Sequence, residues 1–145
     1  KQKAKKSKID DINFIEGDAE NLPFDDNTFD KLVIGYGLRN LGNPEKGIQE
    51  FNRVLKPGGK IGILEFFPPK SGIMSAIFKL YFNKILPRIA SLFSNSKAYR
   101  YLPESVQNFV STQELEELLL NNSFNDICTK NMSFGITTFI NAIKQ

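Results

Sequence analysis

A chain of 145 residues with a hydrophobic share of 41% is long enough and apolar enough to bury one core. The net charge is +3, but five lysines lie in the first eight residues, so the remainder carries no basic excess and no nucleic-acid partner is expected. The sequence has no histidine and a single cysteine, Cys128. This composition excludes histidine-based dyads, an internal disulfide and a cysteine-based metal site, and no metal is expected.

The first half of the chain has the pattern of an α/β fold. Residues 12–16 predict a short strand, and the apolar run 32–34 predicts a strand buried on both faces, as in a parallel sheet. Asn43 before Pro44 predicts the capped start of a helix, which residues 56–59 (Lys-Pro-Gly-Gly) end. Residues 60–66 predict the next buried strand, so strands alternate with crossovers.

The second half continues the same domain. Residues 71–93 are apolar and helix-prone, and residues 94–110 are irregular, so 71–110 are expected to form an insert or lid over the substrate. The other interpretation of this apolar stripe is ordinary core. Ser111 predicts the cap of a helix that runs to about Asn122, followed by strands near 124–130 and 134–143. Residues 1–145 are therefore expected to form one partial domain, and no run of 18 apolar residues predicts a membrane-spanning helix.

Polar residues follow the predicted strands where ligands of open parallel sheets bind. Asp18, with Ala19 after it, is placed to accept a hydrogen bond from an adenine amino group while a backbone amide donates to the ring; a turn aspartate is the alternative. Gly35 and Tyr36 open a glycine-containing turn that lets the backbone approach a ligand. Arg39 is expected at the mouth of this site, with a surface ion pair as its alternative.

Two further positions belong to the same edge of the predicted sheet. Asn40 follows Arg39 and is likewise expected at the mouth of this site. Glu65 stands at the end of the strand over residues 60–66, where it either faces the pocket or closes the strand.

These features resemble a known family. The run Gly17–Phe66 resembles the part of class I S-adenosylmethionine methyltransferases that follows the cofactor loop. The segments Gly37–Asn40, Leu64–Phe66, Leu86–Ile89 and Tyr99–Ser105 more narrowly resemble the ubiquinone/menaquinone biosynthesis C-methyltransferases. The resemblance implies a Rossmann-like three-layer sandwich, with a mostly parallel sheet and an antiparallel last strand. It also implies methyl transfer from S-adenosyl-L-methionine to a ring carbon of a polyprenylated quinol such as demethylmenaquinol.

The resemblance also implies roles for individual residues. Asp18, Ala19, Gly35 and Tyr36 would bind the cofactor, Arg39 and Asn40 would be catalytic, and Phe78, Tyr99 and Tyr101 would contact the substrate. Because a guanidinium does not give up its proton, Arg39 is expected to act electrostatically, by lowering the pKa of the quinol hydroxyl.

The sequence departs from the family pattern at one point. The Gly-rich loop that holds the methionine end of the cofactor, and the acidic residue for its ribose, are not found. The chain is therefore expected to be the carboxyl-terminal two-thirds of a domain that lacks its first strands. Two alternatives stay open: a non-catalytic methyltransferase-like module in a quinone-synthesis complex, and a methyltransferase for another small molecule.

The expected partners follow from a lipophilic quinol substrate. Residues 73–93 would make a peripheral contact with a membrane. A homodimer or a quinone-synthesis complex is expected, in the cytoplasm at the inner face of the membrane, or in an organelle of a eukaryotic source.

Overall fold

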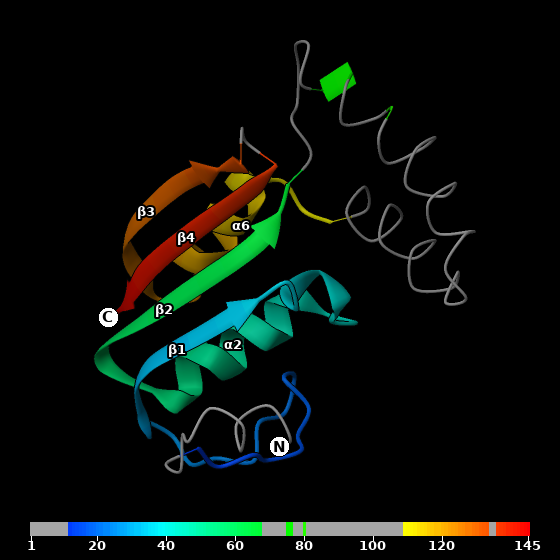
Figure 1. Cartoon of the computed structure of the whole chain (residues 1–145). Coiled ribbons are helices and arrows are strands. Elements are labelled where there is room, and N and C mark those ends of the chain that lie inside the picture. The colour runs from blue at the N-terminus through cyan, green and yellow to red at the C-terminus, as the bar shows by residue number, and fades with distance from the viewer. Residues whose placement is uncertain (1–11, 68–74, 77–79, 81–108, 134–135) are drawn as a thin grey trace, which may run out of the picture.

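The computed structural model describes residues 12–67, 75–76, 80, 109–133 and 136–145. In these residues a four-stranded sheet in the order β1-β2-β4-β3 carries two helices on one face (Figure 1). The elements are β1 (Phe29–Gly35), the short 3-10 helix η1 (Leu38–Asn40), α2 (Pro44–Val54), β2 (Leu55–Phe66), α6 (Thr112–Asn121), β3 (Phe124–Met132) and β4 (Thr137–Lys144).

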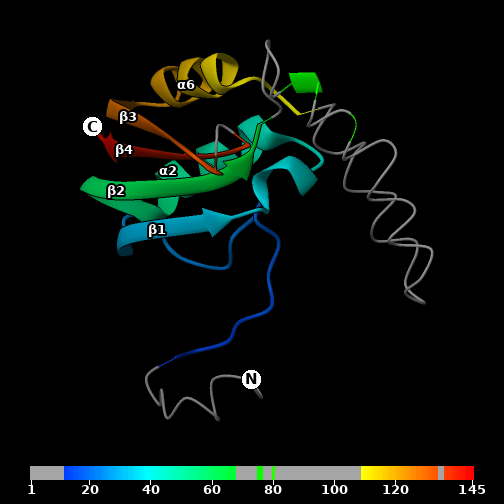
Figure 2. The same cartoon turned by 45° about the horizontal axis from the view of Figure 1, so that its top comes forward.

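Three of the four strands run in one direction. β1 and β2 are parallel and are joined through α2, while β4 is antiparallel to both of its neighbours, β2 and β3 (Figure 2). β3 therefore runs the same way as β1 and β2, and the last strand alone is reversed. This confirms the predicted α/β class with a mostly parallel sheet and an antiparallel last strand.

The predicted crossover helix is present with its predicted cap. The Asn43 side chain accepts a hydrogen bond from the Lys46 amide, and Pro44 occupies the first turn, where its missing N–H costs nothing. The helix ends at Val54, and β2 begins at once rather than after the Lys-Pro-Gly-Gly motif. Residues 56–59 form a bulge opposite the single residue between Phe29 and Lys31 of β1.

α6 begins with the predicted Ser111 cap, and the full reciprocal pair is formed. The Glu114 amide donates to the Ser111 hydroxyl, and the Ser111 amide donates to the Glu114 carboxylate at 2.6 Å. The two bonds satisfy donors that every helix start leaves unpaired, so a local pattern fixes the beginning of α6.

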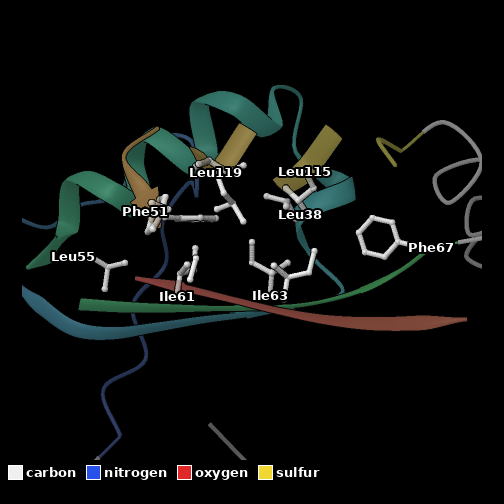
Figure 3. Close-up of a cluster of buried hydrophobic side chains, with 12 residues drawn as sticks. Leu38, Phe51, Leu55, Ile61, Ile63, Phe67, Leu115 and Leu119 are labelled. Atoms are coloured by element: carbon white, nitrogen blue, oxygen red, sulfur yellow. The ribbon is translucent and has the colours of Figure 1, made fainter. Parts of the chain in front are cut away.

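The core lies between the two helices and one face of the sheet (Figure 3). Ile61 and Ile63 of β2 point toward Leu115 and Leu119 of α6 and toward Phe51 of α2. The buried hydrophobic residues are Leu38, Ile48, Phe51, Val54, Leu55, Ile61, Ile63, Phe67, Leu115, Leu119, Phe124, Ile140 and Ala142.

Two predictions about the first strands were wrong. Residues 12–17 form no strand, and Ile12, Phe14 and Ile15 are 45–60% exposed. Residues 32–34 do form a strand, but it is not buried on both faces, since Val33 is 76% exposed. Residues 12–16 pair with none of the described strands, and Val33 alternates with the core-packed Leu32 and Ile34, so it lies on the face of the sheet away from α2 and α6.

The predicted insert over residues 71–110 lies almost wholly outside the described residues. None of the described helices is long and apolar enough to cross a bilayer.

Candidate functional site

The parallel pairing of β1 and β2 brings two predicted segments together at the carboxyl ends of these strands. Gly35 lies opposite Leu64, and the Tyr36 amide donates to the Leu64 carbonyl at 2.8 Å. The η1 turn that carries Arg39 and Asn40 therefore stands directly over Glu65.

Arg39 is held in a nearly buried ion pair. Its Nη1 atom donates to Glu65 Oε1 at 2.6 Å and to the Tyr36 carbonyl at 2.8 Å, and its side chain is only 8% exposed. The guanidinium carbon lies 5.5 Å from the centre of the Phe66 ring, a cation–π contact. The surface ion pair considered from the sequence is thus an ion pair, but not a surface one.

Glu65 is fully buried at the end of β2, and its carboxylate receives three hydrogen bonds. Besides the Arg39 side chain, the Phe66 amide donates to Oε1 at 2.9 Å and the Arg39 amide donates to Oε2 at 3.4 Å. A buried carboxylate is tolerated only when such donors replace water. Glu65 thus ties the backbone and the side chain of Arg39 to the end of β2.

Tyr36 occupies a strained position between the two strand ends. Its φ of 54° lies in the left-handed region, which costs a non-glycine residue roughly 1–2 kcal/mol. This conformation turns its carbonyl toward Arg39 Nη1 and toward Asn40 Nδ2, which donates at 3.2 Å. It also places its ring on Phe66, with ring centres 4.5 Å apart. Strained backbone of this kind concentrates at functional sites.

The loop with Asp18 lies against the turn that follows Asn40. Asp18 is exposed, and its Oδ1 atom accepts from the Glu20 amide at 2.9 Å. Glu20 in turn accepts a hydrogen bond at 3.0 Å from the amide of Asn43, three residues after Asn40. The predicted adenine-binding and catalytic segments are therefore linked at one end of the described sheet.

Arg53 of α2 fixes the rest of this loop, a role that the sequence did not reveal. Its guanidinium donates to the carbonyls of Leu22 and Phe24, at 3.0 and 2.8 Å, and pairs with Asp26 and Glu50. The hydrogen bond from Arg53 lowers the pKa of Glu50, and the two carboxylates raise the pKa of Arg53. The only available signal was its position before a Lys-Pro-Gly-Gly turn, which favoured a purely structural interpretation.

An apolar groove of about 300 Å³ runs beside β1, and neither Arg39 nor Glu65 belongs to its lining. Ala19 and Leu22 line one part of it, and Leu32, Ile34 and Phe51 another. Ala19 thus lies between the Asp18 loop and the core, while Arg39 and Asn40 are not in its lining.

Three predicted substrate contacts, Phe78, Tyr99 and Tyr101, lie outside the described residues. Within the described part of the chain, no three His, Cys, Asp or Glu side chains are grouped so that they could hold a metal ion.

The sequence is similar to a family of known proteins. Residues 1–144 match the model of the ubiE/COQ5 methyltransferase family. A ubiquinone/menaquinone biosynthesis C-methyltransferase of Geobacter sulfurreducens is 43% identical over 120 residues, which are 83% of this chain and 47% of the relative. A demethylmenaquinone methyltransferase of Staphylococcus haemolyticus is 38% identical over 144 residues, 99% of this chain and 60% of the relative. The chain spans about half the length of the curated relatives that it matches.

Solved structures agree with the fold. A SAM-dependent methyltransferase of Aquifex aeolicus superposes with a TM-score of 0.66 at 15% identity, over 99% of this chain and 61% of that one. The YcgJ protein of Bacillus subtilis superposes with a TM-score of 0.64 at 17% identity, over 99% of this chain and 76% of that one.

Proposed function

The chain belongs to the ubiE/COQ5 methyltransferase family, and on this premise we propose that it carries the catalytic half of a quinol C-methyltransferase. The reaction is methylation of a ring carbon of a polyprenylated quinol, either demethylmenaquinol or the benzoquinol of the ubiquinone pathway. The observation that carries the proposal is the cluster of Tyr36, Arg39 and Asn40 at the carboxyl end of β1, over a buried Glu65. Relatives at about 40% identity that are named for this reaction support the substrate class.

The cofactor of the family is S-adenosyl-L-methionine, and part of a site for it fits the described residues. The adenine amino group would bind Asp18, whose described side-chain contacts engage only Oδ1. The adenine ring would lie near Ala19, which is half-buried beside the apolar groove, and the chain at Gly35 and Tyr36 would follow the methionine part. When bound, the cofactor supplies an activated methyl group on a sulfonium leaving group.

Arg39 and Asn40 would act on the quinol. A hydroxyl that is deprotonated or strongly hydrogen-bonded pushes electron density onto the neighbouring ring carbon, which makes that carbon a better nucleophile. Arg39 cannot serve as a base, but a guanidinium held in place by Glu65 and the Tyr36 carbonyl stabilises a phenolate-like oxygen without having to reorganise. Asn40 would orient the same oxygen. Removing one preorganised donor of this kind lowers turnover by roughly 100-fold.

The remaining contacts are proposed for the lipophilic end of the substrate. Phe78, Tyr99 and Tyr101 would line its path, and the apolar segment that carries Phe78 would meet a membrane surface. A homodimer or a quinone-synthesis complex would be the assembly.

The test uses the chain alone and a fusion in which the part of the Geobacter sulfurreducens relative that precedes its matched region is joined ahead of Lys1. Isothermal calorimetry measures S-adenosylmethionine binding, and transfer of a radiolabelled methyl group to demethylmenaquinol in detergent measures activity. The proposal expects binding and transfer in the fusion. Absence of transfer in both forms, despite cofactor binding, would assign the chain to another small-molecule methyltransferase.

Substitution of Asp18 tests its proposed role in binding the cofactor. Asp18→Asn should weaken cofactor binding at least about tenfold, because its remaining oxygen accepts from the Glu20 amide and its NH2 group then meets the adenine amino group, donor against donor. Asp25→Asn, which removes an exposed carboxylate from the same loop, is the matched control and should leave binding unchanged. If neither the chain alone nor the fusion binds the cofactor, the result would instead support the non-catalytic module.

A further inference from the structure

The buried carboxylate of Glu65 has no assigned role in the reaction, yet within the described residues each hydrogen bond to it comes from Arg39 or from the adjacent backbone. We infer that Glu65 is a positioning residue, which sets the orientation of the Arg39 guanidinium for the quinol oxygen. This inference rests on the proposed function, since it assumes that Arg39 acts on the substrate.

Glu65 and Arg39 belong to different strand–turn units, 26 positions apart, and they meet only because β1 and β2 are parallel and in register. Glu65 Oε2 accepts from the Arg39 amide and Oε1 from its Nη1 atom, so one carboxylate fixes both ends of the same residue. A side chain gripped at its backbone and at its tip has little rotational freedom left.

Two further groups contact the guanidinium. The Phe66 ring lies beneath it and the Tyr36 carbonyl accepts from the same Nη1 atom that Glu65 holds. These two contacts limit the guanidinium on further sides, but neither has the charge of Glu65. A charge-assisted hydrogen bond is roughly twice as strong as a neutral one, so Glu65 is the strongest of these three contacts.

The orientation of a catalytic group affects the rate of the reaction. A reacting group displaced by about 1 Å can lose about 100-fold in turnover. Loss of Glu65 would leave Arg39 in place in the sequence but no longer preorganised. The expected effect is on turnover rather than on the binding of the cofactor, whose proposed contacts are with Asp18 and Ala19.

The test compares four variants in whichever form of the chain, alone or fused, methylates demethylmenaquinol: Glu65→Gln, Glu65→Asp, Arg39→Ala and Glu65→Gln with Arg39→Ala. Glu65→Gln should lower kcat about tenfold or more and leave the KM for S-adenosylmethionine within about twofold. Arg39→Ala should lower kcat about 100-fold, and the double variant should be no worse than Arg39→Ala alone. Asp30→Asn, which breaks the ion pair with Lys56 at the far end of β1, is the control and should keep full activity.

A role limited to folding would give a different result. Glu65→Gln would then lower the melting temperature while kcat per folded molecule stayed at the parent value, and this outcome would overturn the inference. Multiplicative losses in the double variant would also overturn it, because they would show that Glu65 acts without Arg39. Glu65→Asp covers the case in which the glutamine variant does not fold.

A second readout does not depend on activity. The side-chain N–H signals of Arg39 in a ¹H–¹⁵N spectrum should be protected from exchange in the parent and should lose this protection in Glu65→Gln. Unchanged Arg39 signals in that variant would contradict the inference, even if quinol methylation itself were not observed. An inactive parent, alone and fused, with the expected spectral change would refute the proposed function and the role toward the quinol, and would leave only the contact by which Glu65 holds the Arg39 guanidinium.

Discussion

The buried ion pair between Arg39 and Glu65 allows a quantitative prediction of the free energy of unfolding. The Glu65 side chain is 0% exposed and the Arg39 side chain 8%, with 2.6 Å between Nη1 and Oε1. Glu65→Met keeps most of the volume but removes the negative charge that faces a guanidinium almost out of water, which also contacts the Tyr36 carbonyl and the Phe66 ring. Removing one partner of a buried pair costs about 3–5 kcal/mol, so the unfolding free energy should fall by that amount.

The reverse substitution should cost less. In Arg39→Met the carboxylate still accepts from the backbone amides of residues 39 and 66, which satisfy part of its need for donors. We therefore expect a loss of about 2–3 kcal/mol. The double variant should lie within about 1 kcal/mol of the parent, because replacing a whole buried pair by apolar groups of similar size is often neutral.

Urea unfolding followed by far-ultraviolet circular dichroism measures all four free energies, provided that the slopes with denaturant stay equal. For a chain of this size each kcal/mol corresponds to about 2–4 °C in Tm, so thermal unfolding is an independent check. A double variant whose loss equals the two single losses added together would refute the reasoning, because it would show that the two side chains do not depend on each other.

Three further predictions concern the packing and the loops. Leu119→Ala, at a fully buried position of α6, should lower the unfolding free energy by about 2–5 kcal/mol in urea titrations. Gly59→Ala should cost about 1–3 kcal/mol in the same titrations, because its methyl group would come within 2.7 Å of a backbone oxygen, whereas Gly58→Ala meets nothing within 4 Å and should cost only the roughly 1 kcal/mol of its positive φ. Glu50 has a pKa lowered below 4.5 by its hydrogen bond with Arg53, so its ionised form stabilises the fold above that value and the contribution is lost as pH falls through the lowered pKa. Unfolding midpoints of Glu50→Gln should accordingly lie below those of the parent at neutral pH and converge with them in acid; a constant difference at all pH values would contradict this.

Elements that depend on neighbours in sequence could be predicted well. The start of α2 follows from Asn43 before Pro44, and the start of α6 from Ser111 with Glu114 three positions later. In each case the side chain that satisfies the free helix amides lies within one turn of them, so the local sequence is enough to predict where the helix begins.

Elements that depend on distant neighbours could not be predicted in full. Residues 12–16 are as β-prone as many strands, but a strand also needs a partner to bond with, and the described structure gives them none. Val33 is exposed for another reason: it is paired with Gly62, but it lies on the face of the sheet away from the two helices. The hydrophobicity of a residue favours its burial, but the position of the residue in the sheet decides whether it is buried.

The candidate site combines both cases. Asp18, Arg39, Asn40 and Glu65 could each be singled out because polar residues after buried strands gather at one edge of a parallel sheet. The pairing of Arg39 with Glu65 could not, because it depends on the register that sets Gly35 opposite Leu64.

This pairing changes what Arg39 can contribute. A lone guanidinium would favour an oxyanion, but it would also disfavour a cationic sulfonium, and both effects would fall only as the inverse of distance. Paired with Glu65 it has no net charge, so its influence falls faster with distance and is greatest on a group in direct contact with the guanidinium. The direction of the pair then matters more than its charge. Glu65→Asp distinguishes the effect of orientation from that of charge, because it keeps the charge and withdraws the carboxylate by one methylene. A loss of turnover in that variant as large as in Glu65→Gln would identify orientation as the property that Glu65 supplies, and full turnover would identify charge balance instead.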